Sequence, residues 1–156
     1  PAACSTAGDW KAEGMGDLKL TYQVDGGDLV QAGEASSQMK MTLKKLGLPP
    51  EIIRKASVCM YEGEINMVIH ADGGRVEVEV GMDAITIRLI DQGPGIPDVD
   101  RAMEEGYSTA GDVARDLGFG AGMGLPNMKR FSDEMRIDTT VGVGTTVTMR
   151  IDINNG

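Results

Sequence analysis

Alternating glycines near residue 120 form the first pattern that could do chemistry. Gly118, Gly120, Gly122 and Gly124 alternate with other residues, and a helical pattern begins at Leu125. Alternating glycines can turn successive N–H groups toward one point, and a helix N-terminus adds its dipole, so this segment predicts an anion or phosphate site. The Lys-Ser/Thr pair of a P-loop is absent here. A plain glycine-rich surface loop is the alternative interpretation.

A carboxylate precedes an earlier glycine loop. Asp91 ends an apolar strand pattern, and Gly93 and Gly95 follow it at once. A carboxylate at the end of a strand can accept a hydrogen bond from an exocyclic amine, and glycines let a flat group approach the backbone closely. Because Asp, Gly and Pro also favour turns, an ordinary turn is the competing interpretation.

Three polar residues are spaced by four in a helical segment. Glu62, Asn66 and His70 therefore form one stripe on a helix, flanked by the apolar residues Cys59 and Ile69. A carboxylate and an amide on a partly apolar face are unusual. Taken alone, the stripe is typical of a solvated helix edge, and His70 of a structural histidine near a helix end.

Periodicity predicts the elements that must position these residues. Strand alternation and helical patterns follow one another in the order β-α-α-β-β-loop-α-β-β. This order predicts an α+β fold: a two-layer sandwich with helices on one face of a mixed, mostly antiparallel sheet. The predicted strands are Leu18–Val24, Arg75–Met82, Ala84–Asp91 and residues 134–140 and 144–153, and the predicted helices are Leu29–Leu46, Glu51–Ala71, Val99–Glu105 and Leu125–Ser132. The second and third strands should form a hairpin that turns at Met82–Asp83.

Composition narrows the class of protein. The 156 residues suit one domain, and the net charge of −9 argues against nonspecific binding to nucleic acid or to an anionic membrane. Two cysteines and one histidine give no metal-site spacing, and no apolar run is long enough to span a membrane. We therefore expect a cytoplasmic protein. Residues 1–14 are interpreted as a tail or a cloning remnant, with Met15 a possible start, and residues 15–156 are interpreted as the domain itself.

Four short motifs, taken in order, resemble those of a known superfamily. Glu62-x-x-x-Asn66, Asp91-x-Gly93-x-Gly95, Gly120-x-Gly122-x-Gly124 and Gly144-Thr145 are similar to the sequence boxes of the GHKL (Bergerat-fold) ATPases. The resemblance runs from about Leu18 to Ile153. The short segment "GIPDVDRAMEEGYSTAG" is similar to the ATP lid of the bacterial anti-sigma factor and switch-protein serine kinases, so the chain looks most like that branch.

The resemblance implies a role for each matched residue, with ATP and Mg²⁺ as cofactors. Asp91 would accept from the adenine amine, with Thr145 on the same water network and Gly93, Gly95 and Ile96 beside the base. Asn66 would bind Mg²⁺, and Glu62 would be the general base acting on a serine or threonine hydroxyl. The phosphates would lie against residues of the second glycine box, namely Gly118, Gly120, Gly122, Met123, Gly124 and Leu125. Lys129 and Arg130 either neutralise phosphate or are solvated helix charges.

The resemblance also implies a partner. The expected substrate is a small regulatory protein of the sulfate-transporter/anti-sigma-antagonist (STAS) type, or another protein of a sigma-factor pathway. Some anti-sigma members have an arginine just before the second glycine box, where this chain has Gly120 or Ala121 and its nearest upstream arginine is Arg115. The sequence therefore fits switch kinases better than kinases that clamp a sigma factor.

Other hypotheses stay open at this stage. The chain could be a nucleotide-dependent binding module, or a histidine-kinase-like ATPase domain, that regulates a partner without phosphorylating Ser or Thr. It could be an ATP-binding part of a larger regulator, or form a homodimer. If water attacks in place of a hydroxyl, the same site is an ATPase.

Overall fold

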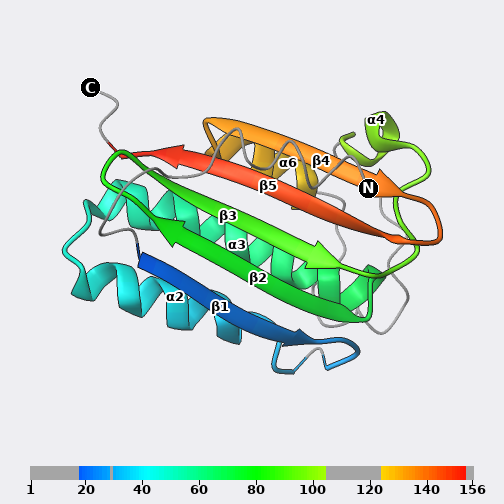
Figure 1. The fold of residues 1–156 in the computed structure, drawn as a ribbon, viewed down its shortest axis with the longest axis horizontal. Coiled ribbons are helices and arrows are strands. Elements are labelled where there is room, and N and C mark those ends of the chain that lie inside the picture. Colours follow the sequence, from blue (N-terminus) through cyan, green and yellow to red (C-terminus); the bar gives the residue numbers. More distant parts are fainter. Residues whose placement is uncertain (1–17, 29, 105–123, 154–156) are drawn as a thin grey trace.

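Five strands form one sheet in the order β1-β2-β3-β5-β4 (Figure 1). The fold is known from a computed structural model, which describes residues 18–28, 30–104 and 124–153. The strands are β1 (Leu18–Asp25), β2 (Gly73–Val80), β3 (Ala84–Asp91), β4 (Glu134–Thr140) and β5 (Gly144–Asp152). All four strand pairs are antiparallel. The sheet predicted to be mostly antiparallel is thus antiparallel at every pairing between these strands.

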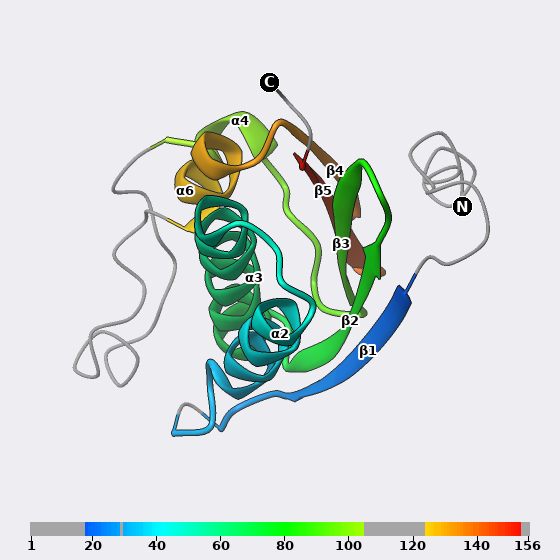
Figure 2. The same cartoon turned by 90° about the vertical axis from the view of Figure 1, so that its left-hand side faces the viewer.

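The helices lie on one face of this sheet and form the second layer (Figure 2). They are α2 (Glu34–Lys45), α3 (Pro50–His70) and α6 (Gly124–Phe131), with the single turn α4 (Val99–Ala102) after the first glycine loop. Alternate strand residues such as Val76, Val78 and Ile87 are fully buried beneath them. The predicted α+β two-layer architecture is confirmed.

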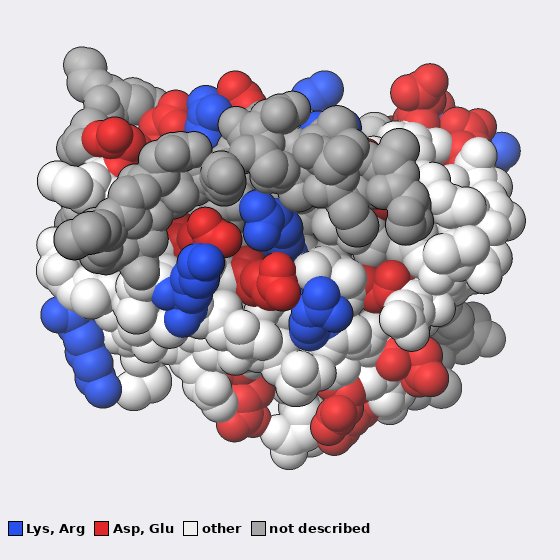
Figure 3. All heavy atoms as spheres, in the orientation of Figure 1, with Lys and Arg blue, Asp and Glu red and all other residues white. Residues whose placement is uncertain are grey.

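The opposite face of the sheet is charged (Figure 3). Arg88 lies near both Glu77 and Glu79 of the neighbouring strand, at 3.8 and 3.6 Å, and Arg150 pairs with Glu134 at 3.1 Å. Opposite charges thus lie side by side across the strands, an arrangement that stabilises cross-strand pairs.

Some element boundaries differ from the prediction. Helix α2 begins at Glu34 rather than Leu29, because the turn before it ends at Gly33, whose φ is +100°. Strand β2 begins two residues early, at Gly73, since the two glycines predicted to end the preceding helix already pair with β1. The short helix α4 ends at Ala102, before the predicted Glu105.

A buried carboxylate explains why α2 begins where it does. Glu64 of α3 is only 3% exposed, and its Oε2 accepts from the N–H groups of Gly33 (2.9 Å) and Ala35 (3.2 Å). Its Oε1 accepts from the N–H group of Ser36 at 3.0 Å and from the Ser36 hydroxyl at 2.6 Å. The first turn of α2 has no side-chain cap of its own. Glu64 therefore satisfies N–H groups that a helix start leaves without partners, and its charge suits the helix dipole.

Helix α3 packs tightly against the sheet at Gly63. A methyl group there would lie 2.4 Å from Cδ2 of Leu89 on β3, which is closer than two carbon atoms can pack. The apolar residues of α3 on this side include Ile52, Ala56, Met60 and Met67, all buried. The absence of a side chain at Gly63 therefore lets α3 lie close to Leu89 of β3.

We expect Glu64→Ala to lower the free energy of unfolding by about 3 kcal/mol, because three buried donors and one part-buried donor lose a charged acceptor. Urea titration measures the change. Glu51→Ala is the matched control, since Glu51 lies in the first turn of the same helix with its side chain 74% exposed. Equal effects of the two substitutions would show that the Glu64 contacts do not hold α2.

Candidate functional site

The predicted stripe on α3 faces the first turns of α6. Glu62 is half-buried, and its Oε2 accepts a hydrogen bond of 2.8 Å from Nδ2 of Asn127. One turn further along α3, the half-buried Asn66 carboxamide lies against Gly124, the first residue of α6. A methyl group on Gly124 would come within 2.9 Å of Asn66 Nδ2 and 3.0 Å of its Oδ1. The structure therefore brings Glu62, Asn66 and the start of α6 together.

A second polar group forms where β3 ends. Oδ1 of Asp91 accepts from the N–H group of Gly93 at 2.9 Å and from that of Thr145 at 3.2 Å. Among the described residues, none donates a hydrogen bond to its Oδ2. Burial raises the pKa of Asp91, and the two backbone hydrogen bonds partly oppose that rise. A ligand that donates a further hydrogen bond to this carboxylate would stabilise its charged form.

Thr139 extends this group, although no motif in the sequence pointed to it. The Thr139 and Thr145 hydroxyl oxygens lie 2.8 Å apart, and the N–H group of Ile96 donates to Thr139 Oγ1 at 2.9 Å. Asp91, Thr145, Thr139 and Ile96 thus form one hydrogen-bonded chain between β3, β5, β4 and the first glycine loop. Two threonines are adjacent here and threonine is common in strands, so the sequence alone does not single out Thr139.

The first glycine loop is anchored at both sides. Gly95 adopts a φ of +80°, and Pro94 C=O accepts from the N–H group of Gly142 in the β4–β5 turn at 2.8 Å. On the other side, a methyl group on Gly93 would lie 2.7 Å from Cα of Ala71, just after α3. The loop therefore rests on the end of the helix that carries Glu62 and Asn66.

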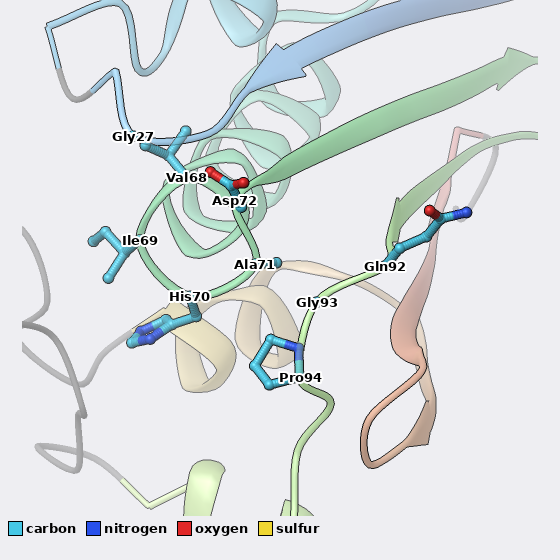
Figure 4. A pocket seen from close by; sticks show the side chains of 9 residues that line it. All are labelled: Gly27, Val68, Ile69, His70, Ala71, Asp72, Gln92, Gly93 and Pro94. Atoms are coloured by element: carbon cyan, nitrogen blue, oxygen red, sulfur yellow. The ribbon is translucent and has the colours of Figure 1, made fainter.

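An open hollow of about 400 Å³ lies between this loop and the end of α3 (Figure 4). His70, half-buried, is one of its lining residues, and burial lowers the pKa of the imidazole. The full lining is Gly27, Val68, Ile69, His70, Ala71, Asp72, Gln92, Gly93 and Pro94. Since Glu62, Asn66 and Asp91 are not among these residues, the hollow adjoins the two polar groups and does not contain them.

The remaining predicted residues belong to the second glycine box and to α6. Gly118, Gly120, Gly122 and Met123 lie outside the described residues. Leu125 is buried in the first turn of α6, whereas Lys129 and Arg130 are exposed in its last turn.

The described part of the chain contains neither a metal-binding cluster of acidic, His or Cys side chains nor a helix that could span a membrane. Across residues 18–28, 30–104 and 124–153, no three His, Cys, Asp or Glu side chains gather as a metal site. A cation held here would rely on an amide oxygen such as that of Asn66 and on ligand oxygens, which suits Mg²⁺. Within the same ranges, every helix is too short or too polar to cross a membrane.

The fold and the order of these groups define an ATPase domain of a known family. Residues 58–155 match the family described as histidine kinase-, DNA gyrase B-, and HSP90-like ATPase, and the chain belongs to this family. Membership implies the use of ATP. The resemblance inferred from the four motifs is confirmed.

Relatives place the chain more narrowly within the family. It is 33% identical over 108 residues to the serine/threonine-protein kinase RsbT of Bacillus subtilis, a match that covers 67% of this chain and 75% of the relative. It is 32% identical over 129 residues to the anti-sigma F factor of Clostridium beijerinckii, covering 78% and 87%. The anti-sigma F factor of Pasteuria penetrans is 37% identical over 95 residues, covering 56% and 60%. These names agree with the anti-sigma and switch-kinase branch.

We expect Mg-ATP to raise the melting temperature by several degrees, because a ligand at about 100 times its Kd stabilises the folded state by roughly 2.7 kcal/mol. Asp91→Asn should lose most of this shift, since the NH₂ group of the new asparagine is itself a donor and cannot accept a hydrogen bond from an amine. Asp25→Asn, an exposed change at the end of β1, is the control. A full shift in Asp91→Asn would remove Asp91 from the nucleotide site.

Gly124→Ala should weaken Mg-ATP binding about tenfold, because the new methyl group displaces the Asn66 carboxamide. Titration calorimetry with Mg²⁺ and with EDTA measures the change. If Gly124 acts through Asn66, adding Gly124→Ala to Asn66→Ala should cause no further loss. A further tenfold loss in the double variant would contradict this contact as the cause.

Proposed function

We propose that this chain is an ATP-dependent protein serine/threonine kinase that phosphorylates a small STAS-like regulatory protein. The observation that carries the proposal is the placement of Glu62. This carboxylate is half-exposed, one helical turn from Asn66 and beside the start of α6, and its hydrogen bond is to a neutral amide. A group so placed can take a proton from a hydroxyl beside bound phosphates. The name of the relative from Bacillus subtilis, a serine/threonine-protein kinase, supports the same activity.

The proposed nucleotide site has two ends. Asp91 and Thr145 would bind the base, with Gly93, Gly95 and Ile96 shaping the loop beside it. Near α6, Gly118, Gly120, Gly122, Met123, Gly124 and Leu125 would surround the phosphates. The Asn66 amide oxygen fits Mg²⁺, which when bound offsets the charge on the phosphates. Because ATP is plentiful in the cytoplasm, we place the activity there.

In the proposed phosphoryl transfer, one residue of this chain, Glu62, takes part directly in moving a proton. Glu62 takes the proton of the partner's hydroxyl while the hydroxyl oxygen bonds to the γ-phosphorus. The bond from that phosphorus to the bridging oxygen breaks, and ADP leaves with its electron pair. In a helix, Cβ atoms four residues apart are about 5–6 Å apart, so a base at position 62 and a metal ligand at position 66 act on neighbouring atoms.

Glu62→Gln tests the proposal, because it keeps the shape of the side chain and removes the base. With [γ-³²P]ATP and STAS-domain proteins from the same genome, we expect transfer to fall at least about 100-fold. The thermal shift with Mg-ATP should persist. A partner with its acceptor Ser or Thr changed to Ala is the substrate control. Transfer at the wild-type rate by Glu62→Gln would refute the assignment of Glu62 as base.

A second function is favoured by the relatives named anti-sigma F factors. In this alternative the ATP-loaded chain sequesters a partner and transfers no phosphate. Capture of a partner with ATP but not with ADP, without a phosphorylated product, would favour sequestration over the kinase.

A further inference from the structure

We propose that Asn127 is a positioning residue that holds the Glu62 carboxylate in place for proton transfer. The inference rests on the proposed function, in which Glu62 is the base. Asn127 Nδ2 donates to Glu62 Oε2 at 2.8 Å, across 65 residues of sequence, and both side chains are half-buried. A glutamate side chain has several rotatable bonds, so a partly exposed one without a partner samples many rotamers. The hydrogen bond selects one of them before any substrate arrives.

Other contacts already hold α6 on α3. Leu125 and Met128 of α6 are buried, with Met128 only 1% exposed. The Cys59 thiol of α3 donates to Met128 C=O at 3.7 Å, and the Arg54 guanidinium lies 5.3 Å from the centre of the Phe131 ring. Because apolar burial and these contacts fix the helix pair along its length, the amide of Asn127 is not required for docking.

The donor is neutral, although cations are close in sequence. Lys129 and Arg130 follow Asn127 by two and three residues and are exposed. An ion pair with either would hold the carboxylate by charge, whereas the neutral amide orients it through one hydrogen bond. The described residues donate no hydrogen bond to Glu62 Oε1, so this oxygen is left for the hydroxyl of the partner.

The same turn of α6 also contacts the predicted metal ligand. Gly124, three residues before Asn127, lies against the Asn66 carboxamide, and Asn66 is one turn from Glu62 on α3. Two contacts one turn apart on α6 therefore match two side chains one turn apart on α3. The base and the amide ligand are positioned by a single rigid helix pair.

A double-mutant cycle with Glu62→Gln tests the inference. Asn127→Leu keeps the number and branching of the side-chain heavy atoms and removes the donor, and Asn127→Asp places a second carboxylate against Glu62. We expect Asn127→Leu to lower kcat for phosphotransfer about tenfold with the KM for Mg-ATP nearly unchanged, and Asn127→Asp to lower it further. In the Glu62→Gln background, Asn127→Leu should cause no further loss. Ser132→Ala removes another α6 hydrogen bond, to Met128 C=O, and should leave kcat unchanged.

A spectroscopic readout tests the contact without catalysis. In ¹⁵N–¹H spectra, the side-chain amide signal of Asn127, assigned by its loss in Asn127→Leu, should shift in Glu62→Gln but not in Ser132→Ala. Wild-type kcat in Asn127→Leu, with Glu62→Gln inactive, would overturn the positioning role alone. Additive losses in the double variant would also overturn it. Full activity of Glu62→Gln would instead refute the proposed base, whereas an unmoved amide signal would refute the hydrogen bond itself.

Discussion

The rotational setting of α3 is the constraint on which the rest of the structure depends. Its apolar side is buried against the sheet, and Gly63 lets it come into contact with Leu89 where a larger residue could not. Once that face is fixed, helical geometry determines the direction in which the other side chains of α3 point. Glu64 reaches the start of α2, while Glu62 and Asn66 face α6. Five consecutive residues therefore place one helix of the scaffold and the two central groups of the proposed site.

Three carboxylates differ in burial and in the number of hydrogen bonds they accept, and these differences match a structural role for one and proposed chemical roles for the other two. Glu64 is buried with four donors, so its charge is fully used in holding α2. Asp91 is half-buried with two backbone donors on one oxygen, and burial still raises its pKa, which suits a residue that awaits a further donor. Glu62 is half-exposed with one neutral donor, which leaves an oxygen available for a proton. The number of hydrogen-bond donors thus decreases from the structural carboxylate, through the proposed base-recognition residue, to the proposed general base.

Local patterns predicted the elements well, and long-range contacts explain where they did not. The predicted strand Arg75–Met82 corresponds to β2, whose Val76 and Val78 are buried, and the β2–β3 hairpin followed from the turn predicted between the two strands. The start of α2 was wrong because its cap is Glu64, which is distant in sequence and looks like one more polar helix residue. Asn127 and Thr139 were missed for the same reason: each matters through a partner on another element, and a single polar residue has no periodicity to mark it.

Helix α3 also relates the two ends of the proposed nucleotide site. The first glycine loop touches Ala71 just after the helix, and Gly124 touches Asn66 five residues earlier. At about 1.5 Å per residue, these contacts are separated by roughly 8 Å along the helix axis, and Glu62 lies about 6 Å beyond Asn66. A nucleotide whose base meets Asp91 and whose phosphates meet α6 would therefore run along the C-terminal half of α3, with its terminal phosphate toward Glu62. The order of the residues along one helix thus agrees with the order of the proposed tasks: base recognition, metal binding and proton removal.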